Sequence, residues 1–413
     1  MSTVVLTGIG IVAPSGVGSE QFWKSTLNGE NHIGPITRFD ASGYRTTLAG
    51  EVQDFDAEQH VDRRQLVQTD RWTWLSLAAA GEAIDDAGLD LAAYDPYQLS
   101  VVLASTSGGN EFGQRELQRL WTGPSRSVGA YQSIAWFYAA STGQTSIRYG
   151  MKGPSSVLAG DTAGGLDTFG HARRTVRRRG GVVLAGGTEA PIGPYAMACQ
   201  SATGLLSTAT DPAQAYRPFD RAANGWIPGE GGAVVAVEDL DEARARGATV
   251  YAEIAGYAAT FDAAAPNRPS ADGRQLQRAI ENALRDAGIS ANDVDVVFAD
   301  AAGVLEFDRS EATALRAVFG TGSDAPLVTA PKALIGRLYS GGSALDVATA
   351  ALAIRDGWVP VVGNLQEAAA GCELPFVTGE SQSADVRVAL IVARGHGGFN
   401  SALVLRRLDD VPT

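Results

Sequence analysis

The chain repeats one local pattern, and this repeat limits the folds that it can adopt. Residues 72–84 place apolar side chains at helical spacing, and Gly88 follows as a helix stop before a strand of buried type at 99–104. A second helix from Gln275 leads in the same way to Gly288 and to a strand at 294–299. The order of helix, glycine stop, loop and strand is therefore the same in both halves of the chain.

Two further pairs of segments follow in the same order. Alternating strands and helices favour α/β layers around a buried sheet, and three ordered pairs favour two copies of one unit. We therefore expect two halves, residues 1–248 and 249–413. The further pairs are a helix opened at 164–167 with a strand at 182–185 against a helix at 343–346 with a strand at 359–362, and a glycine-led strand at 231–237 against one at 399–405.

The bulk composition excludes several classes of protein. A chain of 413 residues with 45% hydrophobic and 19% charged residues can bury a large core. Its net charge of −13 argues against nucleic acid or an anionic membrane as the main partner. Two cysteines, Cys199 and Cys372, without a CxxC pair fit a reducing cytoplasm. The four histidines lack metal-ligand spacing, and we expect no signal peptide and no membrane span.

Several glycine-rich blocks carry a resemblance to one enzyme family. Residues 160–167 read Gly-Asp-Thr-Ala-Gly-Gly-Leu-Asp and resemble the nucleophile segment of the condensing enzymes, the 3-ketoacyl-carrier-protein synthases. Other blocks of that family are matched, in order, by residues 149–155, 185–189, 217–220, 228–231 and 395–400. The resemblance runs from about residue 3 to residue 408.

This resemblance implies an α/β, thiolase-like fold with duplicated βαβαβαββ halves in a layered α/β/α/β/α arrangement. In that fold the active site lies at the N-termini of two central helices. Backbone N–H groups and the helix dipole favour an oxyanion or a thiolate there.

The catalytic positions of the family hold other residues in this chain. A condensing enzyme uses a cysteine thiolate as nucleophile and two histidines to support decarboxylation and stabilise the oxyanion. The matching positions are Thr162 for the cysteine and Asp300 and Arg337 for the histidines, and neither cysteine lies in these blocks. Lys332 and Glu311 match residues of the family's polar network and are expected to be structural remnants. We therefore expect no catalytic residue and no independent condensation.

The replacement residues have ordinary structural interpretations. A threonine at a helix start commonly serves as an N-cap, and we expect this inert role, or simple filling of space, for Thr162. For Asp300 we expect a structural ion pair or hydrogen bond, with Arg337 as a partner.

The same departures resemble the chain length factors, the ketosynthase-beta subunits of type II polyketide synthases. Blocks at 298–304, 328–332 and 336–342 are similar to that subfamily, although its frequent glutamine at the nucleophile position is Thr162 here. The resemblance implies a heterodimer with an active ketosynthase-alpha subunit and an acyl carrier protein that delivers substrates on its phosphopantetheine arm. It implies no cofactor for this chain. The growing poly-β-ketone chain would occupy a tunnel at the subunit interface.

The tunnel gate and two accessory sites are also implied by the resemblance. The gate falls on residues Asn110, Phe112, Gly113 and Leu117, and the small side chains at 110 and 113 predict a roomy tunnel and a long product, aromatic or polyene. His396 stands where active members have a gating phenylalanine and is a candidate for the tunnel mouth. A basic run is either a solvated helix end or a docking site for the acidic carrier protein. That run comprises Arg173, Arg174, Arg177 and Arg178, followed by Arg179.

Two other functions stay open at the level of sequence. The chain could be an enzyme, a malonyl-carrier-protein decarboxylase or initiation acyltransferase that uses Thr162 with Asp300. It could also be a scaffold that stabilises the ketosynthase without setting product length.

Overall fold

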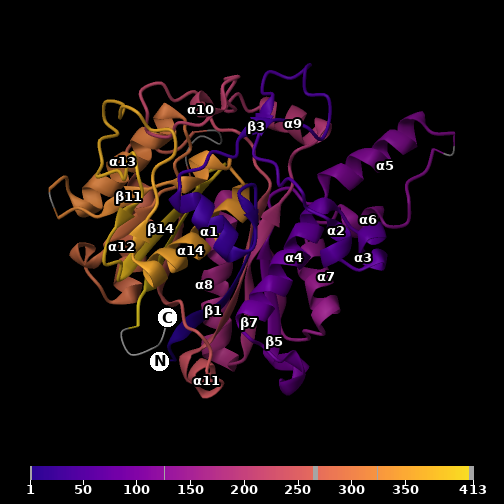
Figure 1. The fold of residues 1–413 in the computed structure, drawn as a ribbon, viewed down its shortest axis with the longest axis horizontal. Helices are drawn as coiled ribbons and strands as arrows, with labels where there is room; N and C mark the ends of the chain where they lie inside the picture. Colours follow the sequence, from indigo (N-terminus) through magenta and orange to yellow (C-terminus); the bar gives the residue numbers. More distant parts are fainter. Residues whose placement is uncertain (1, 125, 264–267, 323, 409–413) are drawn as a thin grey trace.

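Two long helices run through the middle of the molecule and pack against each other (Figure 1). They are α8 (Thr162–Arg179) and α14 (Tyr339–Asp356). The computed structural model describes residues 2–408 apart from 125, 264–267 and 323. Strands of both halves contact this helix pair, and other helices cover the outer faces of the sheets. The layered thiolase-like fold predicted from the sequence is confirmed.

The first half forms one side of this arrangement. Its strands lie in the order β1-β8-β7-β5-β6, with β5 and β6 parallel to each other and β1 and β8 antiparallel. Helix α4 (Arg71–Asp86) covers β1 and β8, and α7 (Ala140–Tyr149) contacts β5 and β6. The strands are β1 (Val4–Ala13), β5 (Leu99–Ala104), β6 (Ser155–Leu158), β7 (Val182–Glu189) and β8 (Gly231–Asp239).

The second half repeats this order on the other side. Its strands lie in the order β9-β15-β14-β10-β11, and the two halves join where β1 pairs with β9. Helix α12 (Arg274–Ala287) covers β9 and β15 and contacts α13 (Leu305–Phe319). The strands are β9 (Ala252–Phe261), β10 (Val296–Phe298), β11 (Leu327–Thr329), β14 (Val388–Gly395) and β15 (Phe399–Arg406).

Shorter elements connect and decorate the two halves. The predicted division at 248–249 falls between α11 and β9. The remaining helices are α1 (Ser19–Leu27), α2 (Ala57–His60), α3 (Arg63–Gln68), α5 (Asn110–Thr122), α6 (Gln132–Ala135), α9 (Pro194–Ser201), α10 (Pro212–Ala215) and α11 (Leu240–Ala245), with 3-10 turns η1 (Leu91–Ala93), η2 (Pro96–Gln98), η3 (Ala291–Asp293) and η4 (Pro331–Leu334). The remaining strands are β2 (Gly16–Val17), β3 (Gly34–Pro35), β4 (Leu48–Ala49), β12 (Trp358–Val359) and β13 (Gln382–Ser383).

The internal duplication is present, with one wrong assignment. Helices α4 and α12 both run into a left-handed glycine, Gly88 with φ 61° and Gly288 with φ 69°, as the sequence pattern predicts. The strand predicted at 359–362 is not the counterpart of β7, because only β12 forms there and it pairs with β13 outside the main sheet. The counterpart is β14, which lies between β10 and β15 as β7 lies between β5 and β8. Val359 and Val361 are buried in the core. The apolar residues at 359–362 therefore indicate a buried connecting segment and not a strand of the main sheet.

Glycine allows the two central helices to approach each other closely at their N-terminal ends. A Cβ atom at Gly165 of α8 would overlap the Ser343 hydroxyl and the Ser340 carbonyl of α14. Residues 340–354 of α14 are buried throughout, as expected for a helix that contacts strands from both halves of the sheet. No helix in the described part of the chain is long and apolar enough to cross a membrane.

We predict that Gly165→Ala destabilises the protein by about 1–3 kcal/mol, because the methyl group must push the central helices apart. Gly143 is the matched control, since it lies inside helix α7 and a Cβ there would meet no atom within 4 Å. Gly143→Ala should leave the free energy of unfolding unchanged or raise it by up to about 1 kcal/mol. Urea unfolding of both variants measures the difference, and equal effects would contradict this account of the helix contact.

Candidate functional site

The N-terminal ends of α8 and α14 meet at a buried site, where the catalytic positions of the family were expected. Thr162 is the first residue of α8, and Asp161 before it takes the cap position with a φ of 51°. The N-cap role expected for Thr162 is therefore wrong. The Asp161 carboxylate accepts a hydrogen bond of 2.6 Å from the backbone N–H of His396, which ties the turn after β14 to the start of α8.

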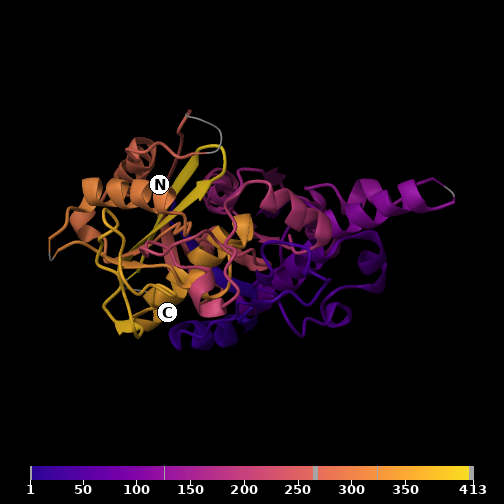
Figure 2. The same ribbon diagram turned by 90° about the horizontal axis from the view of Figure 1, so that it is seen from above.

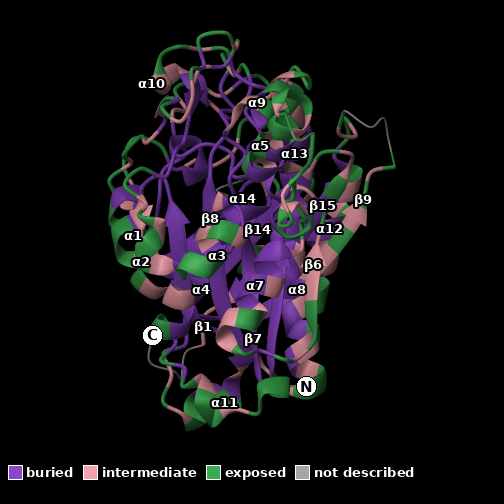
Figure 3. Cartoon of the chain, turned by 90° about the vertical axis from the view of Figure 1, so that its right-hand side faces the viewer, coloured by how far each residue is buried: buried purple, intermediate pink, exposed green. Residues whose placement is uncertain are grey.

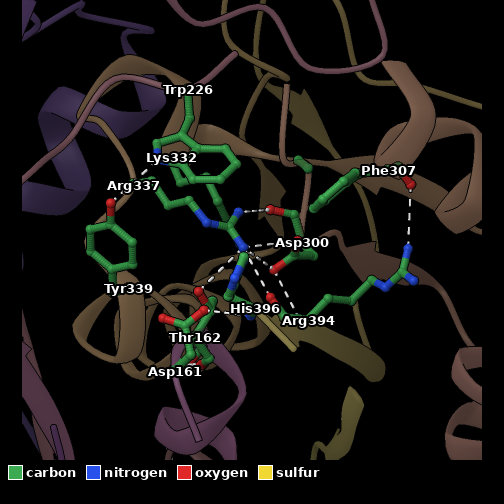
Figure 4. Close-up of polar contacts among 12 residues, drawn as sticks. Asp161, Thr162, Trp226, Asp300, Phe307, Lys332, Arg337, Tyr339, Arg394 and His396 are labelled. Atoms are coloured by element: carbon green, nitrogen blue, oxygen red, sulfur yellow. Dashed lines mark hydrogen bonds and ion pairs between the residues drawn. The ribbon is translucent and has the colours of Figure 1, made fainter. Parts of the chain in front are cut away.

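An ion pair between Arg337 and Asp300 occupies the centre of the site (Figure 4). Arg337 Nη2 lies 3.1 Å from both carboxylate oxygens of Asp300 and donates to Thr162 Oγ1 at 3.2 Å. Arg337 Nη1 also donates to the Asp300 carbonyl at 3.3 Å. Both side chains are almost fully buried. The pairing expected between these two residues is confirmed, and the structure brings all three replacement residues into contact.

Neighbouring groups hold the charges of this pair in place. Burial alone would lower the pKa of Arg337, but the negative charge of Asp300, with Tyr216 and Asp161 nearby, outweighs it and raises that pKa. The guanidinium also lies over the Trp226 ring at 5.2 Å and donates to the Arg394 carbonyl at 3.0 Å. Arg337 is therefore a permanent cation that offers only hydrogen-bond donors. It cannot accept a proton from Thr162.

Glu311 and Lys332 lie in the surroundings of the pair. The Glu311 carboxylate accepts from the backbone N–H groups of Asp300 and Ala301 at 2.7 and 2.9 Å, so it fixes the segment after β10. Burial raises the pKa of Glu311, and the charge of Asp300 raises it further. Lys332 forms a buried ion pair with Asp346 of α14. Both contacts hold backbone segments together.

A cavity of about 220 Å³ remains beside the ion pair. Arg337, His396 and Cys199 all contribute to its wall, although Cys199 belongs to α9 and lies in none of the family blocks. His396 is exposed on the turn between β14 and β15. Sequence reasoning did not name Cys199, Trp226 and Tyr339 as wall residues. Tyr339 is the first residue of α14 and follows Arg337 closely. Cys199 and Trp226 lie far from the three replacement residues in the sequence, so no local pattern places them at the cavity. The wall also includes Asp161, Gln200, Thr203, Trp226, Asp262, Phe307, Tyr339 and Arg394.

The backbone around the site keeps unusual conformations. Asp161, Ala301 and Tyr339 have φ values of 51°, 52° and 49°, which side-chain-bearing residues rarely adopt. Each lies beside one of the replacement residues or at the start of α14. Such conformations cluster at functional sites, where the surrounding structure enforces them. Three residues with positive φ therefore lie around the ion pair.

The residues expected to form the tunnel gate lie on α5, apart from the cavity beside the ion pair. Helix α5 projects from the body of the molecule (Figures 1 and 2). Phe112 and Gly113 are buried, Asn110 is half-buried, and Leu117 is exposed. The room expected beside Gly113 is not open, because a Cβ there would lie 2.7 Å from Trp136 Cδ1.

The basic run on α8 is divided between the interior and the surface. Arg173 is buried, pairs with Asp286 and donates to the Ala255 carbonyl at 2.6 Å, so neither alternative for the run, a solvated helix end or carrier docking, holds for this residue. Arg174 lies over the Tyr257 ring, and Arg177 donates to the Ser2 carbonyl. Arg178 is exposed. The run ends α8, whose 18 residues span about 27 Å from the site at its start.

Comparisons with known proteins agree with this geometry. Family models of the beta-ketoacyl synthase N-terminal and C-terminal domains match residues 1–243 and 251–366. The tetracenomycin polyketide synthase ketoacyl synthase beta subunit of Streptomyces glaucescens is 52% identical, over 98% of each chain.

Two solved structures are similar to the whole chain. The ishigamide ketosynthase/chain length factor superposes with a TM-score of 0.92 at 29% identity, covering 98% of this chain and 99% of that chain. A type II acyl-carrier protein in complex with its ketosynthase bound to the hexaketide gives a TM-score of 0.90 at 26% identity, covering 98% and 100%.

We predict that Asp300→Asn destabilises the protein by about 3–5 kcal/mol, because it leaves the Arg337 charge buried without a counter-charge. The double variant Asp300→Asn/Arg337→Met should recover most of that loss, since the charge is removed as well. Urea unfolding measures both variants.

The exposed pair Arg221–Glu367 provides the control for this experiment. Glu367→Gln should change the free energy of unfolding by less than about 1 kcal/mol. If Asp300→Asn is equally mild, or if the double variant is no better than the single one, the ion pair does not hold the site together.

Proposed function

The chain belongs to the beta-ketoacyl synthase family, and from this premise we propose that it is a chain length factor of a type II polyketide synthase. In this role it pairs with an active ketosynthase-alpha subunit and shapes the tunnel that limits poly-β-ketone length. The observation that carries the proposal is the buried Arg337–Asp300 ion pair. Its two residues stand at the positions where the sequence resemblance expects the family's catalytic histidines.

The chemistry of the site supports a subunit without its own condensing activity. A condensing nucleophile must be deprotonated by a nearby base or have a low pKa. Thr162 Oγ1 instead accepts a hydrogen bond from Arg337, and both oxygens of Asp300 face the same guanidinium. A decarboxylase or acyltransferase that uses Thr162 with Asp300 would need Asp300 to leave this ion pair.

The face that carries α5, α7 and β6 has the features expected of an interface with a partner subunit (Figure 3). Strand β6 ends the sheet order and is only partly buried, so its outer edge offers unpaired strand positions to a second chain. Most of the large exposed hydrophobic side chains in the described residues also fall in one stretch of chain. These side chains, which we call the aromatic patch, are Leu117, Trp121, Val128, Tyr131, Ile134, Trp136, Phe137, Tyr138 and Ile147.

An apolar patch of this kind marks a protein interface more often than a free surface. A related ketosynthase-alpha subunit of the same fold is the partner that fits it, because the two similar structures contain ketosynthases with a chain length factor or a carrier protein. Substrates would arrive on the phosphopantetheine arm of an acyl carrier protein, and we propose no cofactor for this chain. The resulting complex would work in the bacterial cytoplasm.

The proposed gate lies at the edge of this interface. Asn110, Phe112, Gly113 and Leu117 belong to α5, whose start is held against the body by the backbone N–H of Phe112 donating to the Asp70 carboxylate at 2.6 Å. The exposed turn with His396 borders the cavity beside the ion pair and would form the tunnel mouth. For the carrier protein, Arg174, Arg177 and Arg178 remain as the candidate contacts.

We predict that Asn110→Phe or Leu117→Phe shortens the product by about one or two two-carbon units, because a bulkier wall excludes the last extensions. The variants are co-expressed with the ketosynthase-alpha subunit and carrier protein, and the products are sized by mass spectrometry. Gln118→Phe is the control, since Gln118 is exposed on the same helix outside the gate positions.

The outcome also separates the chain length factor from a scaffold. Normal product length in both gate variants, with a complex that still assembles and produces at the usual yield, would show that this chain stabilises the ketosynthase without setting length.

A further inference from the structure

We propose that Trp136 forms the closed end of the tunnel by filling the recess over Gly113. Because residue 113 is a glycine, α5 has no side chain there that could limit product length, and Trp136 would do so instead. The inference rests on the proposed function and names the residue that carries it out. Trp136 belongs to none of the gate positions predicted from the sequence.

The indole of Trp136 occupies the place of a side chain at position 113. Gly113 lies buried in α5, and a Cβ atom on it would stand 2.7 Å from Trp136 Cδ1 and 3.5 Å from Trp136 Nε1. A separation of 2.7 Å is shorter than carbon atoms tolerate without repulsion. The five-membered ring of the indole therefore lies against the helix backbone at Gly113, and glycine is the residue that permits this contact.

Backbone contacts fix the position of this tryptophan. The N–H of Gly109 donates to the Trp136 carbonyl at 3.2 Å. A Cβ at Gly108 would lie 2.6 Å from that carbonyl, and one at Gly109 would overlap the carbonyl of Ala135. Gly108 also has a φ of 66°, which favours glycine. Three glycines at and near the start of α5 thus allow the segment 135–136 to pack closely against it.

The outer face of Trp136 remains available to a partner and to a product chain. Its side chain is 52% exposed and belongs to the aromatic patch that we assign to the ketosynthase-alpha subunit. In the heterodimer the ring would lie between α5 and the partner, which is where the proposed tunnel ends. A rigid apolar wall suits this position, and the indole N–H can donate to a ketone oxygen of the poly-β-ketone chain.

The contact makes positions 113 and 136 interdependent. Removing the indole opens a cavity at the tunnel end, because the surrounding helix relaxes only in part. A large side chain placed at 113 cannot coexist with Trp136 but can replace it. The roomy tunnel predicted from Gly113 is therefore expected only in the Trp136→Ala variant. In the natural chain the indole of Trp136 fills the space beside Gly113.

The test compares product length in complexes with the ketosynthase-alpha subunit and carrier protein. Trp136→Ala should lengthen the main product by about one two-carbon unit or more, as expected when a large side chain is removed from a wall. Trp136→Phe should give a partial shift. Adding Gly113→Leu to Trp136→Ala should refill the recess and return the product toward its original length. Tyr97→Ala is the control, because Tyr97 is a large aromatic side chain that is 68% exposed and lies outside the aromatic patch, so its removal should leave length unchanged.

Each outcome separates the inference from the function on which it rests. Unchanged length in Trp136→Ala, in a complex that co-purifies normally, overturns the role of Trp136; if Asn110→Phe still shortens the product, the chain length function stands. If neither Trp136→Ala nor the gate variants change length, the chain length function itself is wrong. If Trp136→Ala prevents assembly, the conservative Trp136→Phe decides, and an unchanged product there rejects the proposal.

Discussion

A buried ion pair holds together the segments that meet at the ends of the two central helices. Arg337 precedes α14, Asp300 follows β10, and together they contact the first residue of α8 and the end of β14. Charges buried this deeply persist only when they are paired and hydrogen-bonded. In the proposed function this structural pair takes the place of a reactive set of side chains. The site stays folded, while its polar groups are committed to each other.

The backbone around this pair has an unusual conformation. Asp161, Ala301 and Tyr339 have positive φ values, of the kind that cluster at functional sites. The close contact of α8 and α14 at Gly165 fixes the relative position of the two helix starts that carry this site. The chain also offers surface features for a partner: an open sheet edge at β6, the aromatic patch and the projecting helix α5. In the proposed function the chain does not form bonds itself but limits product length by filling space at the tunnel end.

The sequence predicted the parts that depend on local pattern and on the family blocks. The glycine stops at Gly88 and Gly288 identified the duplicated helices, and the family blocks identified Thr162, Asp300 and Arg337 as residues of one site. The pattern failed where burial, and not sheet pairing, makes a segment apolar, as at 359–362. It also failed for Arg173, because the carboxylate of Asp286 that pairs with it comes from the other half of the chain.

Long-range packing set the limit of prediction at the proposed gate as well. A glycine at 113 indicates space only if nothing else enters it, and the sequence has no local signal that the segment at 136 returns to α5. Cys199 was missed for the same reason, since α9 reaches the cavity through loops.

The central claim is that this chain keeps the frame of a condensing enzyme without its activity, and the isolated protein tests it most directly. The purified chain is incubated with malonyl-loaded acyl carrier protein, and intact-protein mass spectrometry follows both acyl transfer to the chain and ketide formation. The account predicts an unmodified chain and no ketide until the ketosynthase-alpha subunit is added. An acyl group on Thr162, or ketides made by the chain alone, would contradict it.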